Sequence, residues 1–285
     1  MNNIKKLLNH VQIFKDHYLI DGWSTVKIGK FYNIAPTSVS KVLRENGIVI
    51  RLNKSSGRKR TYNINENYFS IIDTEIKAYI LGFIYADGYL TAKNKLGITL
   101  NIKDEPILLK IKKEMDSEYP LHYFDSAYSE KHKSTPHVRF LIGSLQIYND
   151  LYNMGCTTNK SDTLEFPTNI PKHLIHHFIR GYFDGDGSVY NRGIYNNYNT
   201  RYESLGFSFI GTQEFLNEIV SNLPFKTNAK LYKEKRTNKN VWEFKTGGIE
   251  RSKIFYNWLY KDSTIYLDRK KQKFEQFLKI DVQRL

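Results

Sequence analysis

A duplicated segment constrains this chain more than any other feature of its sequence. Residues 80–88 and 179–187 align without a gap, and each is an apolar stretch that ends in Asp-Gly. Gly82 and Gly181 stand at the same place in the two copies. Because a glycine weakens a helix interior by roughly 0.5 to 1 kcal/mol, matched glycines predict two helices whose backbones pack closely. The repeat therefore favours two similar halves that meet along this helix pair.

Each of the two helices ends in an acid, Asp87 in the first copy and Asp186 in the second. A carboxylate at a helix C-terminus faces the negative end of the helix dipole, and two adjacent carboxylates also repel each other. A divalent cation such as Mg²⁺ would reverse both effects, since it binds carboxylate and carbonyl oxygens. Asp-Gly is also a common turn dipeptide, which is the simpler interpretation of either copy alone.

The segments that follow the two acids recur in the same order and support the functional interpretation. After Asp87 the pattern predicts strands and helices at 97–102, 105–115, 122–128, 136–142 and 145–154. After Asp186 it predicts them at 204–210, 213–222, 229–234, 241–245 and 250–260. Lys160 and Lys270 follow at matched places, and most of the extra length of the second copy precedes Gln213. This predicts a longer hairpin near residues 192–201.

Residues 1–50 predict a small all-α domain of the helix-turn-helix type. Apolar residues recur at helical spacing around Val26 and again around Val39, Pro36 suits the first turn of a helix, and residues 3–18 form a preceding helix. The polar face of the second helix would then enter the major groove, with Thr37, Ser38, Ser40, Lys41 and Arg44. A helical bundle that binds nothing or binds protein is the alternative. Residues 51–62 predict a basic linker.

The charge of the chain indicates a polyanionic partner. Lys and Arg number 43 against 29 Asp and Glu, a net charge of +14, and residues 1–62 alone carry 12 basic and 3 acidic side chains, a net +9. The 14% aromatic content favours nucleic acid over a membrane surface, because aromatic rings stack on bases. The single Cys156 excludes an intramolecular disulfide, and no apolar run has the length of a membrane span.

The paired segments resemble the signature helices of the LAGLIDADG homing endonucleases, in the two-repeat, single-chain form. The resemblance covers residues 63–285, and Tyr85 departs from the family pattern at the first acid of copy one. It implies an α+β fold of two pseudo-symmetric αββαββα halves, 63–172 and 173–285, with antiparallel saddle sheets. It also implies that Asp87 and Asp186, with the carbonyls of Ala86 and Gly185, hold the catalytic Mg²⁺ or Mn²⁺.

The resemblance extends to further candidate site residues. Lys160 and Lys270 are similar in position to the family's basic residue that offsets charge on the phosphate, and Asp104 and Gln213 to its polar group near the attacking water. Asp104 could instead be the N-cap of a helix. The sheets are expected to contact the major groove through Lys93, Asn101, Arg139, Arg192, Arg201, Lys230, Tyr232, Lys233, Lys235 and Arg236.

The sequence therefore predicts a monomeric, Mg²⁺-dependent, site-specific endonuclease that cuts both strands of DNA. Two alternatives share the fold: a transcription regulator that has lost cleavage, and an intron RNA maturase, so RNA binding stays open. The two acids and two lysines argue against the regulator. The expected location is the cytoplasm, of a bacterium or a phage-infected host, or an organelle, and the protein is not expected to be secreted.

Overall fold

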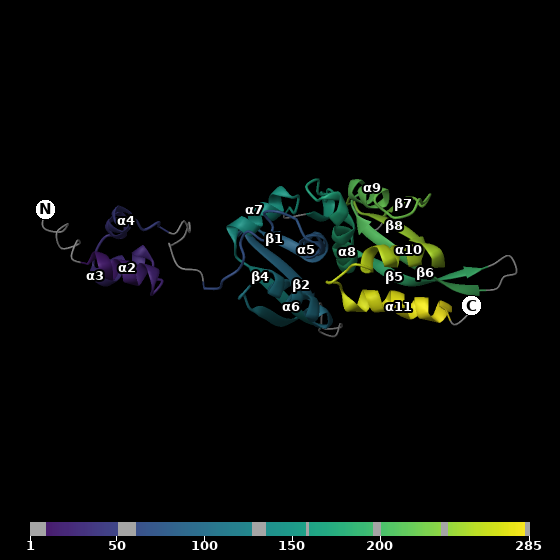
Figure 1. Cartoon of the computed structure of the whole chain (residues 1–285), viewed down its shortest axis with the longest axis horizontal. Coiled ribbons are helices and arrows are strands. Elements are labelled where there is room, and N and C mark those ends of the chain that lie inside the picture. The colour runs from purple at the N-terminus through teal and green to yellow at the C-terminus, as the bar shows by residue number, and fades with distance from the viewer. Residues whose placement is uncertain are drawn as a thin grey trace. The chain divides into compact units, whose positions relative to one another are not determined.

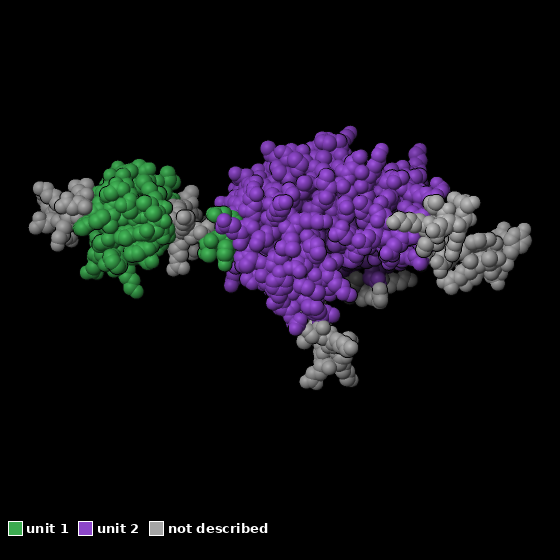
Figure 2. Space-filling view, turned by 60° about the horizontal axis from the view of Figure 1, so that its bottom comes forward, with its two compact units in different colours: residues 1–63 green, residues 64–285 purple. Residues whose placement is uncertain are grey.

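The computed structural model describes residues 10–50, 61–126, 135–157, 160–195, 201–234 and 239–282. The chain divides into two compact units, residues 1–63 and 64–285 (Figure 2). Most of the predicted linker lies outside the described residues. Within the described ranges, no helix combines the length and apolar character needed to cross a bilayer.

The described part of the smaller unit contains three short helices: α2 (Val11–Leu19), α3 (Thr25–Tyr32) and α4 (Pro36–Glu45). The Ser24 side chain caps α3 by accepting a hydrogen bond from the Lys27 amide, and Pro36 begins α4 as expected. Five buried residues form its core: Phe14, Tyr18, Ile28, Val39 and Leu43. Helices α3 and α4 agree with the sequence pattern, and α2 covers the second part of the helix predicted at 3–18, whose residues 3–9 lie outside the described residues. The action of these helices as a helix-turn-helix stays a prediction.

The larger unit repeats one order of elements, and this confirms the predicted αββαββα halves. The first half contains α5 (Glu75–Asp87), β1 (Gly88–Thr91), β2 (Lys95–Asn101), α6 (Glu105–Glu114), β3 (Leu121–Ser126), β4 (Thr135–Ile142) and α7 (Leu145–Asn153). The second contains α8 (Ile175–Asp186), β5 (Ser188–Tyr195), β6 (Arg201–Gly211), α9 (Gln213–Ser221), β7 (Leu231–Lys233), β8 (Trp242–Gly247) and α10 (Ile249–Tyr260). A further helix, α11 (Asp268–Val282), follows, and three short 3₁₀ turns are η1 (Ile102–Asp104), η2 (Lys160–Asp162) and η3 (Lys172–Leu174).

Each half folds its four strands into one antiparallel sheet, ordered β1-β2-β4-β3 and β5-β6-β8-β7. The two sheets therefore have the same topology. The hairpin of the second half is longer, because β5 pairs with β6 as far as Tyr195 opposite Arg201, whereas β1 pairs with β2 only to Thr91 opposite Lys95. This confirms the extended hairpin that the longer interval in the second copy predicted.

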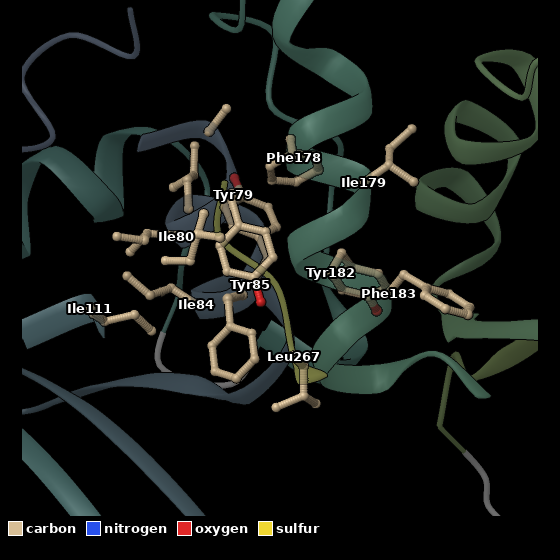
Figure 3. Close-up of a cluster of buried hydrophobic side chains, with 14 of the residues drawn as sticks. Tyr79, Ile80, Ile84, Tyr85, Ile111, Phe178, Ile179, Tyr182, Phe183 and Leu267 are labelled. Carbon is tan, nitrogen blue, oxygen red and sulfur yellow. The ribbon is translucent and has the colours of Figure 1, made fainter. Parts of the chain in front are cut away.

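Helices α5 and α8 lie side by side at the centre of the larger unit, with one sheet on either side (Figure 1). The middle of α5, residues 78–85, is buried all round, as expected for a helix without a polar face. Figure 3 shows Tyr79, Tyr85, Phe178 and Tyr182 from the two helices in one apolar cluster, with Leu267 nearby. The helix pair is thus the shared core of both halves.

Candidate active site

Two glycines set the closeness of the α5 and α8 backbones. A Cβ on Gly82 would overlap the carbonyl oxygen of Phe178, and a Cβ on Gly181 would overlap the carbonyl oxygen of Tyr79. Near the helix ends, a Cβ on Gly185 would overlap the side chain of Ala86 and lie 3.0 Å from Oδ2 of Asp87. No residue larger than glycine fits at these places without moving a backbone. The two helices can therefore approach this closely only because glycine stands at these positions.

Asp87 and Asp186 end the two helices and influence each other's charge. Asp87 is half-buried and Asp186 is exposed. Burial, and then the negative charge of Asp186, raise the pKa of Asp87 to about 6. The protein atoms packed around the Asp186 carboxylate also raise its pKa, although the residue has an exposed side, while Lys160 and Lys270 oppose that rise. The structure therefore brings the two predicted acids into one electrostatic site with unfavourable negative charge.

Each half places one lysine at the end of its signature helix. Nζ of Lys160 donates to the carbonyl oxygens of Ile84, Tyr85 and Ala86 at 2.7, 2.5 and 2.7 Å. The last carbonyls of a helix have no partner within it and face the negative end of the dipole, so an ammonium group is a favourable partner. Burial lowers the pKa of Lys160.

Lys270 repeats this arrangement in the second half. Its Nζ donates to the carbonyl oxygens of Phe183, Gly185 and Gly187 at 2.5, 3.1 and 2.5 Å. Burial lowers its pKa to about 8, with the nearby Asp184 acting in the opposite direction. The two lysines predicted at matched register thus occupy matched places beside the two acids.

The other two polar candidates differ in their surroundings. Both carboxylate oxygens of Asp104 accept hydrogen bonds from Arg269, at 2.8 to 3.1 Å. Asp104 occupies the N-cap position of α6, as the alternative interpretation expected, but its side chain makes no capping hydrogen bond. Gln213 is exposed at the start of α9, and it is not among the described partners of the two acids or the two lysines. Catalytic roles for both stay predictions.

Known proteins resemble this chain in fold more than in sequence. No family model matches the chain. Among solved structures, the I-LtrWI LAGLIDADG homing endonuclease bound to target DNA has a TM-score of 0.50, with 14% identity over 77% of this chain and 92% of that one. The LAGLIDADG meganuclease I-CpaMI bound to uncleaved DNA has a TM-score of 0.50, with 13% identity over 75% of this chain and 93% of that one. This chain has the LAGLIDADG fold.

A curated relative of a different description matches a shorter stretch. The DNA-directed RNA polymerase subunit Rpo1C of Methanocaldococcus jannaschii is 31% identical over 114 residues, or 39% of this chain. The chain spans only 12% of that protein's length. At 14 and 13% identity, the TM-scores of 0.50 to the two solved LAGLIDADG structures show the fold alone.

The ends of α5 and α8 carry oxygen atoms of the kind that a divalent cation binds. No cluster of three or more His, Cys, Asp or Glu side chains that could hold a metal occurs among the described residues, so a cation here would have two carboxylates, those of Asp87 and Asp186, with carbonyl oxygens and water as its other ligands. The carbonyls of Ala86 and Gly185, predicted as further ligands, accept hydrogen bonds from the two lysines. A carbonyl oxygen has two lone pairs, so a second position remains for a cation.

Stabilisation by Mg²⁺ is expected to depend on pH. Because the pKa of Asp87 is raised to about 6, its native carboxyl stays protonated at pH values where the unfolded chain is ionised. In metal-free protein this lowers the free energy of unfolding progressively as the pH rises from the ordinary carboxyl pKa of 3.8 to about 6, and the full cost remains at higher pH. A bound cation would offset that cost. The difference in melting temperature between Mg²⁺ and EDTA should widen as the pH rises through about 6. A pH-independent difference, or one that persists in Asp87→Asn, would contradict this.

The open face of the first sheet, opposite its core face, carries an ordered basic side chain. On β2, Thr99 lies opposite Arg139 of β4, and Nε of Arg139 donates to Oγ1 of Thr99 at 3.2 Å. The Arg139 guanidinium lies 4.6 Å from the ring centroid of Phe124, which stacks on His137. Asn101 shares this face opposite His137, and its side chain also accepts a hydrogen bond from the Lys103 amide.

The second sheet separates two of the predicted DNA contacts. Tyr232 lies opposite Glu243, and Lys233 lies opposite Trp242. Because successive residues of a strand point to opposite faces, Tyr232 shares the open face with Glu243 and Lys233 points the other way. Lys245 is also on the open face and forms a 2.7 Å ion pair with Glu243. Of these residues, the pleat therefore favours Tyr232 and Lys245 as groups that face a ligand.

The remaining predicted contacts lie at sheet edges or outside the described residues. Lys93 is exposed in the turn between β1 and β2, and Lys230 is exposed just before β7. Arg192 pairs with Ser204 and Arg201 with Tyr195 in the long hairpin. Lys235 and Arg236 lie outside the described residues. In the smaller unit, α4 exposes Thr37, Lys41 and Arg44, while Ser38 and Ser40 are half-buried.

Proposed function

We propose that this chain is a monomeric, site-specific DNA endonuclease that cuts both strands and requires a divalent metal, Mg²⁺ or Mn²⁺. One observation carries the proposal: two acids from two halves meet at the ends of one helix pair, and each has its own lysine. A helix pair that served packing alone would have no use for two carboxylates and two buried ammonium groups in one place.

The residues of the site have distinct roles in this proposal. Asp87 and Asp186 would hold the cation, which when bound would activate water and neutralise charge on the phosphate. Lys160 and Lys270 stay within hydrogen-bonding distance of the helix-end carbonyls, so their ammonium groups are oriented before DNA arrives. Fixed positive charge next to a scissile phosphate stabilises the negative charge that develops during hydrolysis. The pKa of about 8 leaves Lys270 mostly protonated at neutral pH.

Double-stranded DNA is the proposed partner. The similar structures of I-LtrWI and I-CpaMI are described as bound to DNA. The open faces of the two sheets present Arg139 and Lys245, and a β-ribbon fits the major groove. An RNA maturase could use the same basic surface, but it would not need the paired acids. Retention of both acids and both lysines likewise favours cleavage over a regulator without activity.

Removal of residues 1–62 is expected to weaken DNA binding without abolishing cleavage. The deletion removes a net charge of +9 and the exposed polar face of α4. The slope of log affinity against log salt should flatten by about 0.9 for each phosphate that the truncated protein no longer neutralises. Both acids remain in the truncated protein, so cleavage should persist at high protein concentration. Equal affinity of the truncated and whole proteins at the same salt would refute DNA reading by this unit.

Selection from a randomised DNA library tests the proposed function. The protein is incubated with circular library DNA and Mg²⁺, and the ends of linearised molecules are sequenced. The proposal expects breaks in both strands at one preferred sequence, and none when EDTA replaces Mg²⁺. DNA spanning the insertion site of the protein's own gene is the natural first substrate. Enrichment of bound but intact DNA under both conditions would favour the regulator and contradict the endonuclease.

A further inference from the structure

Lys270 depends on the backbone at the start of α11 for its position. Lys270 lies in the first turn of α11, yet its ammonium group reaches the end of α8, and the residue as a whole is only 5% exposed. A lysine side chain has four rotatable bonds, and ordering it costs up to about 2 kcal/mol of conformational entropy. Three carbonyl acceptors can hold the ammonium only if the helix that carries it begins at a fixed place.

Asp184 fixes that place from within α8. Its side chain is fully buried. One carboxylate oxygen accepts hydrogen bonds from the Tyr79 hydroxyl at 2.8 Å and the Leu267 amide at 2.7 Å, and the other accepts from the Tyr260 hydroxyl at 2.9 Å. The carbonyl oxygen of Leu267 in turn accepts a hydrogen bond from the backbone amide of Lys270 at 3.1 Å, so Leu267 occupies the N-cap position of α11. The carboxylate therefore anchors the residue from which α11 starts.

A second anchor lies beside Lys270. The neighbouring Arg269 donates to both carboxylate oxygens of Asp104, at 2.8 to 3.1 Å. Asp104 belongs to the first half and Arg269 to the second, so this ion pair ties the start of α11 to the opposite half. The Arg269 side chain is 56% exposed and that of Asp104 is 11% exposed. Because the Arg269 partner is largely exposed to solvent, this pair contributes modestly, and Asp184, which is fully buried, is the main anchor.

The first half holds its lysine in another way. Tyr85 stands where Asp184 stands in the second copy, and its hydroxyl donates to the carbonyl oxygen of Met154, just after α7. Lys160 lies in the short turn η2 and not in a long helix. The two lysines thus share two matched carbonyl positions, Ile84 with Phe183 and Ala86 with Gly185, and reach them from different supports.

We infer that Asp184 is a positioning residue that holds Lys270 at the end of α8 through the Leu267 amide, with the Arg269–Asp104 pair as a second anchor. The catalytic consequence of this inference rests on the proposed function. The position of the ammonium group itself does not, and can be measured without DNA.

Chemical labelling of lysines in the full-length protein tests the positioning role. Acetic anhydride modifies accessible amines, and mass spectrometry gives the rate at each lysine. Asp184→Ala should increase labelling of Lys270 by about tenfold or more and leave Lys160 unchanged. Asp184→Asn should remain within about threefold of wild type, because its amide can still accept from Leu267 and Tyr79 and donate to the Tyr260 oxygen.

The matched control is Tyr85→Phe, which removes the hydrogen bond at the equivalent position of the first half and should leave Lys270 protected. If Asp184→Ala does not fold, Arg269→Gln decides the question, since it removes an anchor at an exposed side chain. That variant should label Lys270 faster than wild type, by a smaller factor. The inference would be overturned if Lys270 were as protected in the folded Asp184→Ala protein as in wild type. If Asp184→Ala does not fold, the same result in Arg269→Gln would overturn it.

Strand-resolved cleavage of a supercoiled plasmid separates positioning from general destabilisation. If each lysine serves one strand, Lys270→Ala should still cut one strand of the plasmid and produce nicked circles. Asp184→Ala should also accumulate nicked circles, with the nick in that same strand. Asp184→Asn should linearise the plasmid faster than Asp184→Ala. Equal slowing of both strands would contradict the positioning role. A wild-type protein that cuts no DNA would refute the proposed function, while the labelling result would still decide the inference.

Discussion

Asp87→Asn and Asp186→Asn are each expected to lower cleavage of both strands by at least about 100-fold, or about 2.7 kcal/mol of transition-state stabilisation. Asparagine keeps the size of the side chain but removes the charge that is proposed to hold a cation between the helix ends. DNA affinity should change little, because binding is expected to come from many phosphate and base contacts over both sheets. Single-turnover cleavage with Mg²⁺ and a filter-binding or fluorescence titration measure the two effects separately.

Stability distinguishes this outcome from unfolding. The pKa of Asp87 is raised to about 6, so its ionised form costs stability at neutral pH and Asp87→Asn removes that cost. The variant should therefore melt at or above the wild-type temperature in EDTA. Asp262→Asn, the same substitution at an exposed carboxylate of the second half, is the matched control and should cleave normally. Normal cleavage by either site variant would show that the assignment of the acids is wrong.

Gly181→Ala is expected to destabilise the larger unit by about 1 to 3 kcal/mol, because a methyl group there overlaps the Tyr79 carbonyl oxygen. In a unit of this size that corresponds to a fall of roughly 2 to 12 °C in melting temperature. Separation of the helices would also move Asp87 away from Asp186. A misplacement of about 1 Å can cost about 100-fold in rate, so cleavage should fall further than the reduced stability explains.

Gly143→Ala provides the matched control for this variant. A Cβ at Gly143 would meet only the Tyr119 hydroxyl, at 3.6 Å, which is an ordinary contact. Its effect on stability should stay within about 0.5 kcal/mol. Gly82→Ala should behave like Gly181→Ala, since its Cβ would overlap the Phe178 carbonyl oxygen. Wild-type melting and cleavage in both helix variants would show that the close helix contact is incidental.

The helices and strands that position the site could be predicted from the sequence, because each of them depends on a local pattern of residues. Apolar runs gave the helices, alternation gave most of the strands, and two matched glycines implied a close crossing. That crossing alone requires the residues at the two helix ends, Asp87 and Asp186, to meet. The matched spacing of Lys160 and Lys270 within the repeat carried the same information for the lysines.

The supporting contacts could not be predicted, because they join residues that are far apart in the sequence. Arg269 and Asp104 are separated by 165 residues, and Leu267 and Asp184 by 83. No periodicity relates these pairs. The alignment of the two copies did contain one signal, since Asp184 stands opposite Tyr85 and both make polar contacts at the helix ends. Because an acid stands at this position in the second copy and a tyrosine in the first, the two halves are expected to hold their lysines through different contacts.

The most direct test of the paired-acid site follows both strands of one DNA substrate, each labelled at its own end, during incubation with the full-length protein. We predict that both strands are cut with Mg²⁺, that neither is cut with EDTA, and that added Mg²⁺ restores cutting. We also predict no cutting by the Asp87→Asn, Asp186→Asn double variant. Cutting in EDTA, or cutting at the wild-type rate by the double variant with Mg²⁺, would contradict a metal-dependent site built from these two acids.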